Sequence, residues 1–167
     1  MTPNWVDLIQ NPQELKTLYP TSPPLHAVTL RSVHLNRYGH ALTLRIDLPE
    51  FPPDPPVEWR EAGFDRFQCQ LRFVAVEHLE MADWNPPVTA DLRFDECGAH
   101  RIRVRVESPG LRLTFEAADA VVIGHMSAFK AGEAGADDGP HQFVGKLDSR
   151  KFSRLPNLDE KTFYERI

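Results

Sequence analysis

The sequence has little of what a metal centre, a disulfide framework or a phosphate-binding loop requires. It contains two cysteines, Cys69 and Cys97, and its seven histidines are never closer than six residues apart. Zinc sites usually show paired His or Cys at short spacing, and small disulfide-stabilised domains need at least four cysteines. No Gly-rich phosphate loop, dinucleotide fingerprint or serine nucleophile motif occurs among its nine glycines. We therefore expect no metal, no cofactor, no catalytic residue and two free thiols.

Long apolar stretches are also missing. No hydrophobic run approaches the ~20 residues that cross a bilayer. Residues 1–20 hold Pro3, Asn4, Asp7 and Pro12 where a signal peptide needs an apolar core. With 167 residues, 41% of them hydrophobic, the chain is long enough for one domain with a true core and a tail. We expect a cytoplasmic protein that binds no membrane.

Positive charge is sparse. The chain has 24 acidic residues against 19 Lys and Arg, a formal net charge of −5. Residues 47–65, called the acidic segment below, hold six Asp or Glu and a single base, Arg60. A basic patch that would neutralise phosphates is absent, so nucleic acid is not the expected partner.

The pattern of apolar residues predicts an α+β fold. Residues 4–9 and 11–19 have helical spacing and capping residues, with Asn4 and Asn11 as the caps. From residue 25 to residue 129, apolar and polar residues alternate as in strands, with a phase shift that indicates a bulge near Arg31-Ser32. We expect a mainly antiparallel sheet of six to eight strands, which could curl into a half-barrel, behind short N-terminal helices.

Two stretches interrupt the strand pattern. Five prolines lie between Pro49 and Pro56, so residues 50–59 are expected to form a stiff, extended loop and not a helix. Residues 77–87 show no clear period and are expected to be an irregular connection. Beyond residue 129 the composition changes to Ala, Gly and acid. We therefore divide the chain into a domain at 1–129 and a linker and tail at 130–167, which ends in a short helix.

The acidic segment is the strongest candidate for a functional surface. A loop that prolines hold extended loses little entropy on docking, and its carboxylates can attract a basic partner. Aromatic side chains nearby would be the anchors of such an interface, although each is also a natural core residue. The candidate partner-binding residues are Glu50, Phe51, Asp54, Glu58, Trp59, Glu61 and Trp84.

The order of these features resembles the immunity protein 50 family over about residues 5–129. The resemblance rests on the Trp5 helix, the strand 42–49, the Phe51-Pro52 and Pro55-Pro56 pairs with Trp59, and the strand 70–73. It implies a small cytosolic protein of a bacterial polymorphic toxin system that neutralises a cognate toxin. It supplies no toxin-contacting residues. A nuclease would suit an acidic surface, because its substrate groove is basic.

Two other classes remain open. The alternating strands would also suit a small-ligand-binding protein or an enzyme with its site in a sheet cavity. The apolar residues of the tail would suit a homodimer in which the tail packs on a second copy.

Overall fold

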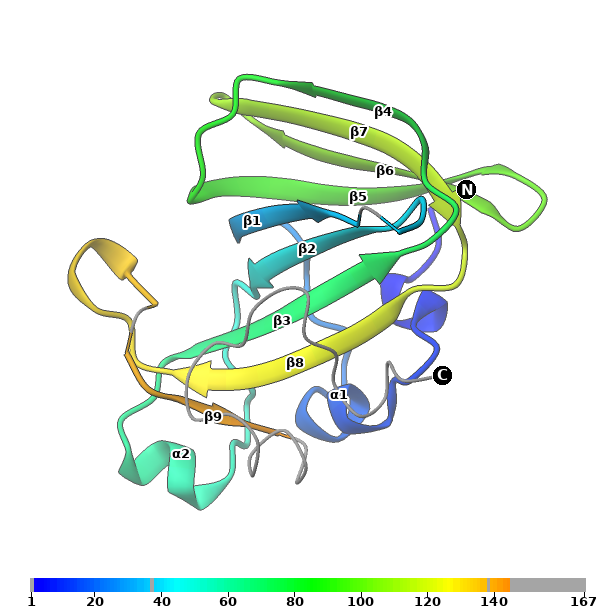
Figure 1. The fold of residues 1–167 in the computed structure, drawn as a ribbon. Coiled ribbons are helices and arrows are strands. Elements are labelled where there is room, and N and C mark those ends of the chain that lie inside the picture. The colour runs from blue at the N-terminus through cyan, green and yellow to red at the C-terminus, as the bar shows by residue number, and fades with distance from the viewer. Residues whose placement is uncertain (1, 37, 138, 145–167) are drawn as a thin grey trace.

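A single antiparallel sheet of nine strands dominates the computed structural model, which describes residues 2–36, 38–137 and 139–144. In spatial order the strands are β4-β7-β6-β5-β1-β2-β3-β8-β9 (Figure 1). Their bounds are β1 (Val28–Leu35), β2 (Leu42–Asp47), β3 (Arg66–Phe73), β4 (Glu77–Ala82), β5 (Val88–Gly98), β6 (Arg101–Ser108), β7 (Leu111–Ala118), β8 (Val122–Phe129) and β9 (His141–Phe143). The expected fold class is therefore correct in outline, with nine strands where six to eight were predicted.

The helices are few and short. A 3₁₀ turn, η1 (Trp5–Leu8), is capped by the side chain of Asn4, as predicted, and is followed by α1 (Gln13–Leu18). Asn11 does not cap α1. Its side-chain amide instead exchanges two hydrogen bonds with the backbone of Ile123, which ties the N-terminal segment to β8.

The sheet curls around its own core without closing. Phe67, at one end of β3, contacts the rings of Tyr19 and Trp59. Phe73, at the other end, contacts the rings of Phe94 on β5 and Phe115 on β7, although neither strand is a neighbour of β3 in the sheet. One row of β3 side chains therefore joins the helical layer to the far half of the sheet. The ends of the strand order, β4 and β9, do not pair with each other.

The phase shift in β1 is a bulge, as predicted. Leu30 pairs with Ile46 of β2, whereas Ser32 pairs with Arg45, so Arg31 is the extra residue. Val28 and Leu30 point to the core before the bulge, and Val33 pairs with the core residue Leu44 after it.

Two predictions of irregular structure are wrong. Val57–Glu61 forms a short helix, α2, which begins directly after Pro56; proline is tolerated there because the first helical N–H groups have no intrahelical acceptor. Glu77–Ala82 forms β4, which pairs with β7 at the edge of the sheet. All six of its residues are exposed, so burial imposes no hydrophobic alternation on its sequence.

The segment after β8 returns to the sheet. It contains a 3₁₀ turn, η2 (Glu133–Gly135), and β9 pairs with β8. The division of the chain at residue 129 stays a prediction, and the short terminal helix lies outside the described residues. No helix in the described ranges is long and apolar enough to span a bilayer.

Candidate functional site

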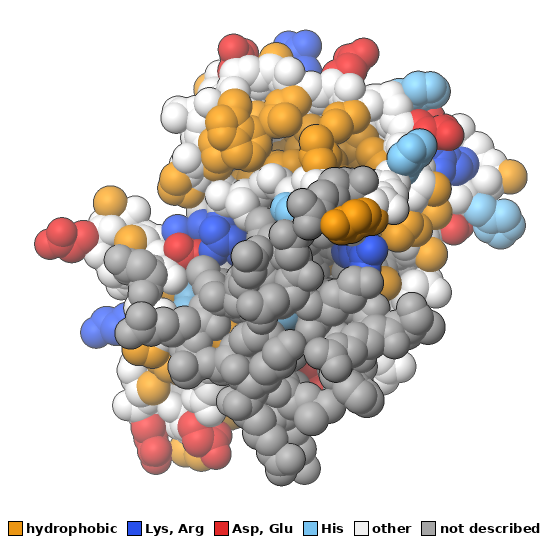
Figure 2. All heavy atoms as spheres, viewed as in Figure 1, with side chains coloured by type: hydrophobic (Ala, Val, Ile, Leu, Met, Phe, Trp, Pro, Cys, Tyr) orange, Lys and Arg blue, Asp and Glu red, His pale blue; other side chains and the backbone are white. Residues whose placement is uncertain are grey.

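The acidic segment presents most of its carboxylates to solvent. Glu50, Asp54, Glu58 and Glu61 are exposed, and acidic side chains gather over α2 at the lower left of Figure 2. Asp54 is paired with Arg60 at 2.7 Å, on the same exposed turn. Within the described part of the chain, Glu50, Glu58 and Glu61 form no ion pair. These three carboxylates are therefore available to an external cation.

Buried aromatic contacts hold the acidic segment in place. Trp59 on α2 is 3% exposed and contacts both Phe51 and Phe67, with ring centroids 6.0 and 6.3 Å apart. The hydroxyl of Tyr19 donates to the carbonyl of Glu50 at 2.6 Å. Of the predicted anchors, Trp59 is a core residue and Phe51 is partly buried against it. They fix the acidic surface and offer little contact area themselves.

Asp47 does not belong to this surface, although it opens the acidic segment in the sequence. Its side chain is 1% exposed and accepts two hydrogen bonds from Arg31, the shorter at 2.6 Å. Gln68 on β3 donates to the second carboxylate oxygen at 2.9 Å. A charge buried this deeply is stabilised by its partners and cannot attract an external partner.

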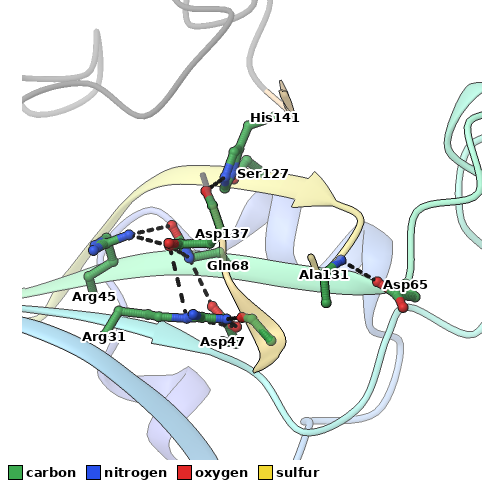
Figure 3. Close-up of polar contacts among 10 residues, drawn as sticks. Arg31, Arg45, Asp47, Asp65, Gln68, Ser127, Ala131, Asp137 and His141 are labelled. Atoms are coloured by element: carbon green, nitrogen blue, oxygen red, sulfur yellow. Dashed lines mark hydrogen bonds and ion pairs between the residues drawn. The ribbon is translucent and has the colours of Figure 1, made fainter. Parts of the chain in front are cut away.

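A cluster of polar side chains covers the sheet face opposite the helices, and the sequence did not predict it. Figure 3 shows Arg31 and Arg45 pointing from β1 and β2 toward Asp137, which reaches them from the segment after η2. Gln68 donates to Asp137 at 2.9 Å, and Arg31 also donates to the carbonyl of Gly135 at 2.6 Å. The two arginines thus hold residues 135–137 against the sheet.

The carboxylate of Asp137 is stabilised in its charged form. Burial alone would raise the pKa of Asp137, but the hydrogen bond from Gln68 and the charges of Arg45 and Arg31 outweigh burial and lower it. The sequence carried a partial signal, since Arg45 and Asp47 lie on the polar phase of β2. Nothing in the pattern indicated that Asp137, 92 residues from Arg45, would join them.

His141 makes further contacts that hold the segment after η2 against β8. The hydroxyl of Ser127 lies 2.8 Å from Nδ1 of His141, and Nε2 of His141 lies 2.9 Å from the carbonyl of Asp137. His141 also stacks on Phe129, with the ring centroids 4.5 Å apart. Burial lowers the pKa of His141, although the Asp137 carbonyl opposes the shift. A neutral ring that donates through Nε2 to the carbonyl and accepts through Nδ1 from Ser127 satisfies both contacts.

Trp84 lies apart from the other predicted site residues. It follows β4 and is 50% exposed, and Figure 1 shows the connection from β4 to β5 at the upper left, whereas α2 lies at the lower left. The structure therefore brings Glu50, Phe51, Asp54, Glu58, Trp59 and Glu61 together on one segment and leaves Trp84 at another edge.

Two open hollows of about 360 Å³ each lie on the described surface. One is lined by Trp5, Arg93, Asp95 and Arg105, and the other by Thr29, Arg31, Arg66 and Thr89, with further residues in each. Neither brings a histidine together with a pair of carboxylates. Among the described residues, no group of three or more His, Cys, Asp or Glu side chains is arranged to hold a metal ion.

Comparison with known proteins gives one match. The family model described as Immunity protein 50 matches residues 11–124, which span both the acidic segment and the sheet from β1 to the start of β8. No curated protein and no solved structure matches the chain.

Proposed function

Because the chain belongs to the immunity protein 50 family, which implies an immunity protein of a toxin system, we propose that it neutralises a cognate toxin by binding a basic region of that toxin through the acidic segment. Binding alone accounts for the activity, and no bond is made or broken. A nuclease is the class of toxin that this surface would suit best, because a groove that binds nucleic acid is basic.

The observation that carries this proposal is the contrast between the two ends of the acidic segment. Asp47 is buried and paired, whereas Glu50, Glu58 and Glu61 are exposed and have no ion-pair partner among the described residues. Surface carboxylates left without a partner cost little in water and gain most when a desolvating interface supplies Arg or Lys.

The backbone of the segment is suited to this use. Prolines restrict the backbone conformation of residues 49–56, and the buried side chain of Trp59 holds α2 against the core. A surface that is already ordered loses little conformational entropy on binding, so more of the interaction energy appears as affinity.

The test is a charge reversal with a matched control. Glu50, Glu58 and Glu61 are changed together to Lys, and binding to the cognate toxin domain, sought first in the genes beside this one, is measured at low and high salt. The control changes Glu96, Glu107 and Glu133, three exposed acids elsewhere, to Lys and alters the net charge equally. We expect affinity to fall at least tenfold for the first variant, most at low salt, and far less for the control. Equal losses in the two variants would reject the acidic segment as the site.

A further inference from the structure

β4 forms one edge of the sheet. Among the described residues β4 pairs with β7 alone, and it ends the strand order of the sheet. Every second residue of an edge strand directs its N–H and C=O away from its neighbour, where another strand can pair with them. Proteins usually block such edges with lysine, proline or a bulge. Here the register shift lies between Glu77 and Glu80, so it leaves the regular pairing of Glu80 to Ala82 intact.

One face of β4 carries apolar side chains that stay partly exposed. Met81 pairs with Leu113 of β7, so Met81 and Leu79 lie on the core side of the sheet. They are 43% and 37% exposed, whereas Leu113 is fully buried. Trp84, 50% exposed, follows directly. Figure 2 shows hydrophobic side chains gathered over this part of the sheet, at the top of the view.

The segment around β4 itself contributes charge of one sign, although Arg112 of β7 lies opposite Ala82. No Lys or Arg occurs between Phe73 and Arg93, whereas Glu77, Glu80 and Asp83 lie in or next to β4. Glu77 is paired with Arg101 at 3.3 Å, which leaves Glu80 and Asp83 without an ion pair in the described part of the chain. An added strand that carried acidic residues would be repelled here, and one that carried Lys or Arg would be attracted.

From these three observations we infer that β4 is a second docking surface for the toxin, resting on the function proposed above. The edge takes an extended toxin segment in which apolar residues alternate with Lys or Arg. Strand addition supplies the backbone hydrogen bonds. The apolar side chains of the segment then cover Leu79 and Met81, while its basic side chains meet Glu80 on the opposite face.

Two measurements with the cognate toxin domain test the inference. Amide hydrogen exchange in residues 79–82 should slow at least tenfold when the toxin domain is added to the full chain. The double variant Leu79→Lys with Met81→Lys should bind the toxin at least tenfold more weakly, because it removes apolar contacts and adds repulsion. Its matched control is the double variant Leu35→Lys with Tyr38→Lys. These two side chains, on and after β1, are more exposed than Leu79 and Met81, and the control should change the affinity less than twofold.

If something other than the toxin occupies the β4 edge, the hydrogen-exchange measurement gives a different result. Each such result would overturn the inference. If the free chain already protects residues 79–82 and deletion of residues 145–167 removes that protection, the chain's own C-terminal segment occupies the edge. If protection grows with protein concentration alone, a second copy occupies it. The Glu50, Glu58 and Glu61 reversal is measured in the same assay. Loss of binding in that variant, with no effect of the toxin on residues 79–82 and none of the β4 variant, would retain the proposed function and reject the β4 edge.

Discussion

Arg31 and Asp47 form an ion pair at 2.6 Å in which the side chains keep only 7% and 1% of their exposure. Arg60 and Asp54 form a pair of nearly the same length, 2.7 Å, with side chains that are 57% and 94% exposed. The two pairs share chemistry and geometry and differ in solvent. The buried pair therefore contributes to the stability of the fold, whereas the exposed pair belongs to the surface that a partner can contact.

Removing one member of each pair should lower stability by very different amounts. Asp47→Ala leaves the buried guanidinium of Arg31 with only the Gly135 carbonyl and the more distant Asp137 carboxylate, and should lower the free energy of unfolding by up to about 3–5 kcal/mol. Asp54→Ala removes an exposed pair and should cost less than about 1 kcal/mol. Urea unfolding of both variants beside the wild type measures the difference. Similar losses for the two would contradict the assignment of Asp47 to the folded core.

The two tryptophans at candidate positions should also behave differently. Trp59 is 3% exposed and contacts the rings of Phe51 and Phe67, so Trp59→Ala should lower the free energy of unfolding by about 3–5 kcal/mol. Trp84 is 50% exposed, and Trp84→Ala should cost less than about 1 kcal/mol. Thermal unfolding of each variant measures the two losses of stability. A stable Trp59→Ala protein would mean that α2 does not depend on this packing.

His141 should make the protein less stable as the pH falls. Because burial lowers the pKa of His141 in the folded chain, the unfolded chain binds its proton first, near the ordinary value of about 6.5. The folded state therefore loses stability as the pH falls through that value. The ring faces Ser127 and the carbonyl of Asp137, while Asp47 favours the proton and Arg45 opposes it.

Urea unfolding at several pH values between 7.5 and 5.5 checks this dependence. His141→Gln should flatten the decrease, whereas His100→Gln, at a side chain that is 91% exposed, should leave it unchanged. An unaltered pH dependence in His141→Gln would show that another group is responsible.

The two free thiols should differ in reactivity. Cys69 is fully buried in the core, where desolvation and the nearby charge of Asp47 raise the pKa of its thiol. Cys97 on β5 is partly exposed. A thiol reagent at pH 8 should label one cysteine in the native protein and two in urea, and Cys97→Ser should abolish the native labelling. Rapid native labelling of Cys69 would contradict its burial.

Strands with one buried face were predictable from sequence, because burial imposes alternation. β2 shows this: Leu42, Leu44 and Ile46 are buried, as their spacing required. β4 was missed for the opposite reason, since an edge strand exposed on all six residues carries no burial pattern. The proline density before α2 hides this helix in the sequence, because a helix can begin directly after a proline.

The acidic composition of the candidate surface was predictable from sequence, but which of its carboxylates are exposed was not. The density of carboxylates in the acidic segment is visible in the sequence, but the burial of Asp47 depends on Arg31 from another strand. The contact of Asp137 with Arg45 joins residues 92 apart, and no local pattern encodes such a pairing.

The bulge in β1 should restrict changes in the length of this strand. Because Arg31 is the residue left over between the pairs Leu30–Ile46 and Ser32–Arg45, its deletion would bring Val28, Leu30, Val33 and Leu35 into one unbroken alternation. The shorter β1–β2 hairpin would then pair without a bulge. It would also lose the Arg31 guanidinium that neutralises Asp47. Natural variants should therefore tolerate substitutions along this hairpin more readily than a single-codon deletion at position 31.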